Sequence, residues 1–214
     1  MIGILFDLDG TLLDTLEDLA DATNYALRQF GYPTRTLAEV RRAIGNGAAN
    51  QIRKSLPEGT PEETVQQVLD VYKPYYTNHC QIKTKPYEGI LKALSRLKEK
   101  YPVAIVSNKP DSAVKALCAD YFPGIYALGE CPDCPRKPAA DMVFKGMRAI
   151  GVERCIYVGD SEVDVLTAEN AGMPCLCVLW GFRDRVDMET VGGVHFCETT
   201  DQFVEKIEEL IHGQ

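Results

Sequence analysis

The chain has 214 residues, of which 31 are acidic and 23 are Lys or Arg, so its formal net charge is −8 at pH 7. That length allows one domain with a sizeable insertion or two small domains. The negative charge argues against nucleic acid and against an anionic membrane surface as partners, but not against a small phosphorylated metabolite, because a bound metal can reverse the local field.

No apolar run approaches the roughly 20 residues that span a bilayer. The N-terminus begins with a strand-like segment and shows no basic stretch or cleavage site. We therefore expect a cytoplasmic protein, a monomer or homodimer, whose eight cysteines are mostly reduced packing residues.

The first predicted element is a strand over residues 2–6, which are apolar and rich in strand formers. Asp7 and Asp9 follow it, and on an extended backbone their side chains would point to the same side. Two carboxylates at ~4 Å in a partly dry cleft would repel by about 4 kcal/mol, a cost that a divalent cation such as Mg²⁺ would remove. Gly10 and Thr11 then turn the chain and leave backbone N–H groups for an anion.

Residues 16–80 show helical spacing without a strand pattern. Helices are expected over residues 16–30, 37–44, 48–56 and 61–76. Thr36 and Glu39 have the spacing of a capping box at the start of the second helix. The Gly45-Asn46-Gly47 turn ends that helix and has Arg41 and Arg42 shortly before it, so it is either a plain turn or a place where a small anion is bound.

From residue 85 onward, strands alternate with helices. Strands are expected over 103–106, 125–128, 155–158, 174–179 and 195–197, and helices over 90–100, 112–121, 141–150, 163–171 and 201–211. This pattern predicts an α/β fold with a Rossmann-like parallel sheet and an inserted helical cap domain. We expect the core domain to comprise residues 1–14 and 83–214 and the cap domain to comprise 15–82. Ligands of such sheets bind at the carboxyl ends of the strands, where the polar residues gather: Asp7, Asp9, Ser107, Asn108 and Asp160.

The stretch from Asp7 to Thr15 resembles the DxDGT(L/V)xDT signature of the haloacid dehalogenase superfamily. Three later stretches resemble its other motifs in the same order. They are the strand end Ser107-Asn108, the Lys137-Pro138 pair before a helix, and G-D-S-x-x-D from Gly159 to Asp164. The third differs from the usual pattern because Ala140 replaces a second proline, which affects the helix start and not the chemistry.

The resemblance implies phosphoryl transfer with an Mg²⁺ cofactor. Asp7 would attack phosphorus and form an aspartyl-phosphate, Asp9 would protonate the leaving oxygen and later activate water, and Lys137 would neutralise the developing charge. The metal would be held by Asp7, the Asp9 carbonyl, Asp160 and Asp164, although Asp164 could instead hold a metal-bound water or Lys137. The phosphate would be bound by Gly10, Thr11, Ser107, Asn108 and Lys137.

Within the superfamily, Asp9 excludes the dehalogenase branch, which lacks the second acid. The stretch 41–48 resembles the cap of the phosphoglycolate phosphatase group, so we expect a carboxylate-bearing substrate, 2-phosphoglycolate first, bound with the help of Arg42, Gly45, Asn46 and Gly47. The alternatives are a phosphatase for a sugar phosphate, a nucleotide or pyrophosphate, and a beta-phosphoglucomutase-like phosphomutase. A more remote one is a binding or regulatory protein without catalysis.

One pattern stands apart from these motifs. Cys131 and Cys134 form a C-x-x-C shortly before Lys137. Such a pair can be a redox couple or half of a zinc site, but no second pair completes a zinc site, and local packing is the simplest interpretation.

Overall fold

The computed structural model describes residues 1–213. The chain forms two compact units: a core unit made of Met1–Asp14 and the chain from Pro86 onward, and a helical unit made of Thr15–Lys85. No helix in the described part of the chain is long and apolar enough to cross a membrane.

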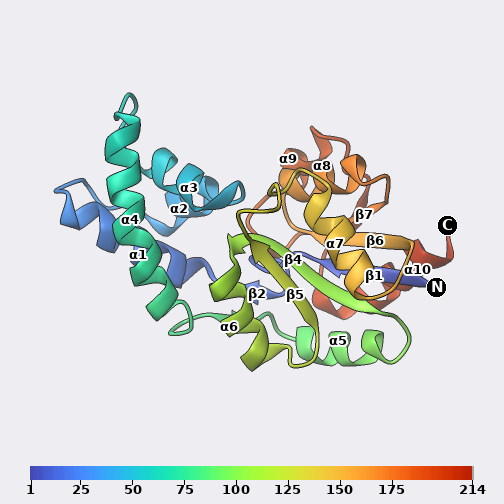
Figure 1. Ribbon diagram of the computed structural model, residues 1–214. Coiled ribbons are helices and arrows are strands. Elements are labelled where there is room, and N and C mark those ends of the chain that lie inside the picture. The colour runs from blue at the N-terminus through green and yellow to red at the C-terminus, as the bar shows by residue number, and fades with distance from the viewer. Residues whose placement is uncertain (214) are drawn as a thin grey trace. The chain divides into compact units, whose positions relative to one another are not determined.

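The core unit contains a six-stranded sheet with the order β5-β4-β1-β6-β7-β8, in which every neighbouring pair is parallel (Figure 1). Its strands are β1 (Ile2–Phe6), β4 (Val103–Pro110), β5 (Tyr126–Glu130), β6 (Arg154–Gly159), β7 (Cys175–Val178) and β8 (His195–Cys197). Its helices are α5 (Ile90–Lys98), α6 (Asp111–Tyr121), α7 (Asp141–Ala149), α8 (Glu162–Asn170), α9 (Arg185–Glu189) and α10 (Phe203–His212), with a 3-10 turn at Thr200–Gln202.

The helical unit contains α1 (Leu16–Gln29), α2 (Leu37–Ala43), α3 (Gly47–Ser55) and α4 (Glu62–His79). The predicted capping box at the start of α2 is confirmed, because the Glu39 N–H donates to Thr36 Oγ1 and the Thr36 N–H donates to the Glu39 carboxylate. Where the chain passes between the units, β2 (Leu13–Asp14) pairs with β3 (Lys85–Pro86). The α/β fold with a parallel sheet and an inserted helical segment is thus confirmed.

The central strand β1 positions the site. Ile4, Leu5 and Phe6 are fully buried, as expected for a strand that has a neighbour on each side and is covered on both faces. Phe6 lies opposite Ile105 of β4 and Val158 of β6. The residues just beyond these three positions therefore meet at one edge of the sheet.

One strand differs from its prediction in a way that matters for the site. β4 continues to Pro110 instead of ending near Val106, with an irregularity in its pairing to β5 between Val106 and Pro110. Ser107, Asn108 and Lys109 are consequently part of the strand and are buried. Polar residues at these positions look like a loop in the sequence, but here they line the edge of the sheet.

Candidate active site

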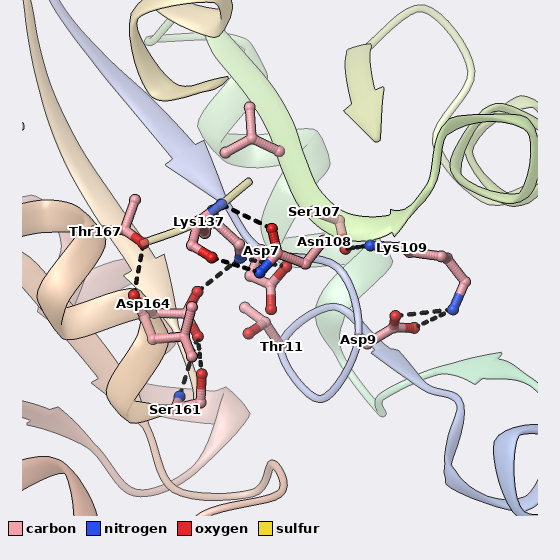
Figure 2. A network of polar contacts seen from close by, with 12 residues as sticks. Asp7, Asp9, Thr11, Ser107, Asn108, Lys109, Lys137, Ser161, Asp164 and Thr167 are labelled. Carbon is pink, nitrogen blue, oxygen red and sulfur yellow. Dashed lines mark hydrogen bonds and ion pairs between the residues drawn. The ribbon is translucent and has the colours of Figure 1, made fainter. Parts of the chain in front are cut away.

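Three carboxylates gather at this edge, and Figure 2 labels two of them, Asp7 and Asp164. Asp7 follows β1, Asp160 follows β6, and Asp164 lies in the first turn of α8. One oxygen from each lies within 4.8 Å of the others, and all three residues are buried. We call these three residues the acid cluster.

Lys137 is the cation of the acid cluster. It lies in the segment before α7, its side chain is 2 % exposed, and its Nζ is 2.8 Å from Asp7 Oδ1 and 2.8 Å from Asp164 Oδ1. It also donates a hydrogen bond of 3.0 Å to the Tyr157 hydroxyl. Burial alone would lower the pKa of Lys137, but attraction to Asp164 and Asp7 outweighs it and holds the pKa well above its ordinary value. Lys137 therefore stays charged.

The backbone of Lys137 is fixed by Asn108. The Lys137 N–H donates to Asn108 Oδ1 at 2.8 Å, and Asn108 Nδ2 donates to the Lys137 carbonyl at 2.9 Å. This reciprocal pair joins β4 to the segment that carries the lysine. The Asn108 side chain, which was predicted to contact phosphate, thus bonds to the backbone of Lys137.

Neutral donors also contact the other two acids. Asp160 accepts from the Thr11 hydroxyl at 3.1 Å and from the Phe182 N–H at 2.6 Å. Asp164 Oδ2 accepts from the Ser161 hydroxyl at 2.7 Å and from the Ser161 N–H at 3.1 Å, which caps α8. Because Asp164 Oδ1 pairs with Lys137, these contacts support the alternative in which Asp164 holds Lys137, and direct metal ligation by Asp164 stays a prediction.

The acid cluster has more negative charge than its lysine can balance. Burial raises the pKa of Asp7 to about 7, although Lys137 opposes the rise, and burial next to Asp164 and Asp7 raises the pKa of Asp160 well above its usual range. When all three carboxylates are ionised, as metal binding requires, the one ammonium leaves two negative charges without a counter-charge. A group of hard oxygen donors with this excess fits a divalent cation such as Mg²⁺.

Glycine permits the close packing of this site. Gly10 has φ +81°, and a Cβ atom at that position would lie 2.2 Å from Asp160 Oδ2. Any side chain there would push the carboxylate aside. The glycine of the first motif is therefore required both by the turn and by the acid next to it.

Asp9 lies apart from the acid cluster and has its own lysine. Lys109 Nζ donates to both Asp9 oxygens, at 2.7 and 2.8 Å, and the Lys109 side chain is 1 % exposed. In Figure 2 the Asp9 carboxylate is turned toward Lys109 and away from Asp7. This differs from the expectation that both carboxylates point to the same side, because the chain leaves strand geometry after Phe6. We call these two residues the Asp9–Lys109 pair.

Sequence reasoning assigned no role to Lys109. The available signal was its position directly after Ser107-Asn108, at a predicted strand end that faces the ligand side of the sheet. A lysine in such a place usually lies in solvent, and its burial becomes visible only because β4 continues to Pro110.

The remaining predicted phosphate contacts are engaged within the protein. The Gly10 N–H donates to the Leu13 carbonyl at 2.9 Å, the Thr11 hydroxyl donates to Asp160, and Ser107 Oγ accepts from the Lys109 N–H at 3.3 Å. These bonds shape the edge of the sheet. Phosphate binding by these three residues stays a prediction.

The predicted substrate residues of the cap lie in the helical unit. Gly45, with φ +123°, lies in the turn between α2 and α3, and Gly47, with φ +77°, is the first residue of α3. Arg42 is near the end of α2 and lines a cavity of about 360 Å³ together with Arg35, Glu39, Ala43, Lys54 and Ser55. Substrate binding by Arg42, Gly45, Asn46 and Gly47 stays a prediction.

The C-x-x-C pattern forms a tight turn. The Cys134 N–H donates to the Cys131 carbonyl at 3.3 Å, and the two residues form an isolated antiparallel bridge. Both thiols are free, and Cys134 is buried. Burial raises the pKa of Cys134 despite the nearby Lys145, so this thiol is not an activated nucleophile.

Known proteins resemble this chain along most of its length. The family model described as haloacid dehalogenase-like hydrolase matches residues 4–178. Phosphoglycolate phosphatase 1 of Pseudomonas aeruginosa is 33 % identical over 191 residues, which cover 84 % of this chain and 70 % of that protein. Phosphoglycolate phosphatase of Rhodobacter capsulatus is 34 % identical over 193 residues, which cover 85 % of each.

A solved structure extends the likeness to the fold. It is a Lactobacillus delbrueckii subsp. bulgaricus protein proposed to be a phosphoglycolate phosphatase, which is 37 % identical and superimposes with a TM-score of 0.91. The match covers 96 % of this chain and 97 % of that one. The chain therefore belongs to the haloacid dehalogenase-like hydrolases and is a phosphatase with a helical cap region between β2 and β4, related to the phosphoglycolate phosphatases.

Proposed function

We propose that this phosphatase hydrolyses a small phosphomonoester that carries a carboxylate, 2-phosphoglycolate first, through an aspartyl-phosphate on Asp7. The observation that carries the catalytic part is the position of Asp7, buried at the end of the central strand between Lys137 and the other members of the acid cluster. The substrate is supported by the names of the relatives and by the cap stretch around Arg42.

In the first step an Asp7 carboxylate oxygen attacks phosphorus, and the bond between phosphorus and the substrate oxygen breaks. Asp9 gives a proton to that leaving oxygen. Lys137, already 2.8 Å from Asp7, neutralises the charge that develops on the phosphoryl oxygens. Gly10, Thr11, Ser107 and Asn108 complete the phosphate site after exchanging some of their present contacts.

In the second step water attacks the phosphorus of the aspartyl-phosphate, and Asp9 accepts its proton. The bond between phosphorus and Asp7 breaks, which releases inorganic phosphate and regenerates the carboxylate. One residue thus acts first as acid and then as base, so its side chain must face the reacting oxygen in both steps.

Mg²⁺ is the cofactor that fits the donor set best. Asp7, Asp160 and the Asp9 carbonyl would hold it, with Asp164 either as a further ligand or as the partner of Lys137. When bound, the ion supplies positive charge that offsets the repulsion between the phosphate and the acid cluster.

The region that reads the rest of the substrate is proposed to be the cap, residues 15–82, which interrupts the core at 1–14 and 83–214. Arg42 and the backbone of Gly45, Asn46 and Gly47 are its candidate groups. A charge-assisted bond from such a group to a carboxylate is worth about 1.5–3 kcal/mol.

The proposal is tested with the purified protein in Mg²⁺ buffer. A generic aryl phosphate measures phosphatase activity as such, and a panel of 2-phosphoglycolate, sugar phosphates, nucleotides and pyrophosphate is ranked by kcat/KM. We expect 2-phosphoglycolate to rank first. A rank below neutral sugar phosphates would overturn the substrate but not the chemistry, whereas no turnover of any phosphate would favour a binding protein.

A further inference from the structure

The Asp9–Lys109 pair poses a problem for the reaction proposed above. Lys109 donates to both Asp9 oxygens and its side chain is 1 % exposed, so the Asp9 carboxylate helps to balance the charge of this buried ammonium. Asp9 is ionised in this pair, so to protonate the leaving oxygen it must turn toward the substrate and first take up a proton from water. Breaking a buried ion pair without replacing the lost partner is costly, because a charge is left uncompensated.

A carboxylate on the substrate could replace the lost partner. In 2-phosphoglycolate a single methylene carbon separates the leaving oxygen from the carboxylate. The cation that holds this carboxylate must therefore lie next to the group that protonates the oxygen. Lys109 Nζ is 2.7 Å from Asp9, whereas Lys137 is engaged with Asp7 and Asp164.

We propose that Lys109 determines substrate specificity by exchanging the Asp9 carboxylate for the carboxylate of the substrate, which frees Asp9 to face the leaving oxygen. This inference rests on the proposed function and adds the core residue that reads the carboxylate. A neutral substrate cannot make the exchange, so Asp9 stays held by Lys109. The carboxylate then raises kcat as well as lowering KM, because turnover itself requires the release of Asp9.

The test compares 2-phosphoglycolate with its amide, phosphoglycolamide, which has the same shape without the charge. The wild-type protein is expected to prefer the acid by about ten- to hundredfold in kcat/KM. In Lys109→Met the preference falls below about threefold, and in Lys109→Arg, which keeps the charge, most of it returns. Both substrates are measured on one enzyme sample, so the ratio does not depend on the fraction that is folded.

Lys115→Met is the matched control. Lys115 is an exposed lysine on α6 that pairs with Asp111, and its removal is expected to leave the preference unchanged. If Lys109→Met is inactive on both substrates, binding is measured instead. Calorimetric titration of 2-phosphoglycolate and phosphoglycolamide into the Asp7→Asn and Asp7→Asn/Lys109→Met proteins gives the ratio of their affinities. Loss of the acid's affinity advantage in the double variant supports the proposal.

Two results would overturn the role of Lys109. One is a preference for the acid that survives in Lys109→Met, and the other is a preference that Lys109→Arg fails to restore although Lys109→Met has lost it. Either result leaves 2-phosphoglycolate as the substrate. A wild-type protein that hydrolyses aryl phosphate but does not prefer the acid overturns the proposed substrate together with this role.

Discussion

The two aspartates of the first motif meet two different electrostatic environments. Asp7 shares Lys137 with Asp164 and lies beside Asp160, so its surroundings have excess negative charge. Asp9, only two residues later, has both of its oxygens on Lys109, so its surroundings are balanced. The difference shows how one motif supplies two functions. The acid cluster needs a cation to balance its charge. In our proposal the Asp9–Lys109 pair needs a substrate carboxylate that replaces Asp9 on Lys109.

The largest effect is expected from Asp7→Asn. The amide is isosteric with the carboxylate but is a poor nucleophile, so kcat should fall more than a thousandfold, about 4 kcal/mol of barrier. Steady-state kinetics with an aryl phosphate measure this, and Asp201→Asn at an exposed position is the control. Activity above about a thousandth of wild type would contradict nucleophilic catalysis by Asp7.

Removal of the metal tests the excess charge of the acid cluster. Exhaustive chelation is expected to abolish turnover and Mg²⁺ to restore it. Without the cation, Asp7 is either protonated and not a nucleophile, or part of a cluster whose unbalanced charge repels the phosphate. Ca²⁺ should inhibit, since its larger and looser coordination sphere misplaces the nucleophile. Full activity in the chelated protein would show that Lys137 alone balances the charge of the acid cluster well enough for catalysis.

The Asp9→Asn variant tests the acid–base role of Asp9 independently of the nucleophilic role of Asp7. We expect a loss of about 10²- to 10⁴-fold on 2-phosphoglycolate, whose alkoxide leaving group needs a proton. The rapid first release of nitrophenol from an aryl phosphate should be affected far less, because this leaving group departs unprotonated. Stopped-flow kinetics resolve that release, and an equal loss on both substrates would argue against Asp9 as the acid.

The acid cluster should also make stability depend on pH in the metal-free protein. Burial raises the pKa of Asp7 from 3.8 to about 7, so the folded protein holds a proton that the unfolded chain releases between these values. Stability is thus retained at low pH and lost as the pH rises through 7, by on the order of a few kcal/mol.

Urea unfolding at pH 5 and 7.5, with chelator or with Mg²⁺, measures this loss. Groups elsewhere in the protein contribute equally to both series, so the difference between the series reports the acid cluster. We expect Mg²⁺ to stabilise the protein more at pH 7.5 than at pH 5. An equal gain in stability from Mg²⁺ at both pH values would mean that the acids are not protonated in the metal-free protein.

The smallest effect is expected from Asn108→Ala, which removes both hydrogen bonds to the Lys137 backbone. The free energy of unfolding should fall by about 1–3 kcal/mol, and kcat should fall with it because Lys137 is no longer held in place. Ser107→Ala at the neighbouring position removes only a 3.3 Å bond within β4 and serves as the comparison in the unfolding assay. If the two variants are equally stable, the Asn108 bonds contribute little.

Local patterns in the sequence were enough to predict much of this molecule. The apolar run at residues 2–6, the helical spacing after Thr15 and the later alternation predicted the parallel sheet with its inserted helices, and these are confirmed. The family resemblance assigned Lys137 and Asp164 to the site, and chain order placed Asp7 and Asp160 at one edge of the sheet, where the structure finds all four together. Periodicity and chain order determine these features because each strand end of a parallel sheet faces the same side.

The partners of individual side chains were decided only by the tertiary structure. Lys109 meets Asp9 across 100 residues of chain, and Asn108 meets Lys137 across 29. These contacts depend on β4 continuing to Pro110, which its polar residues did not indicate. A buried ammonium or amide takes whichever partner the packed chain brings within hydrogen-bond distance. No local pattern encodes that choice, because burial removes water from both groups at once and only the partner that the fold supplies can compensate for its loss.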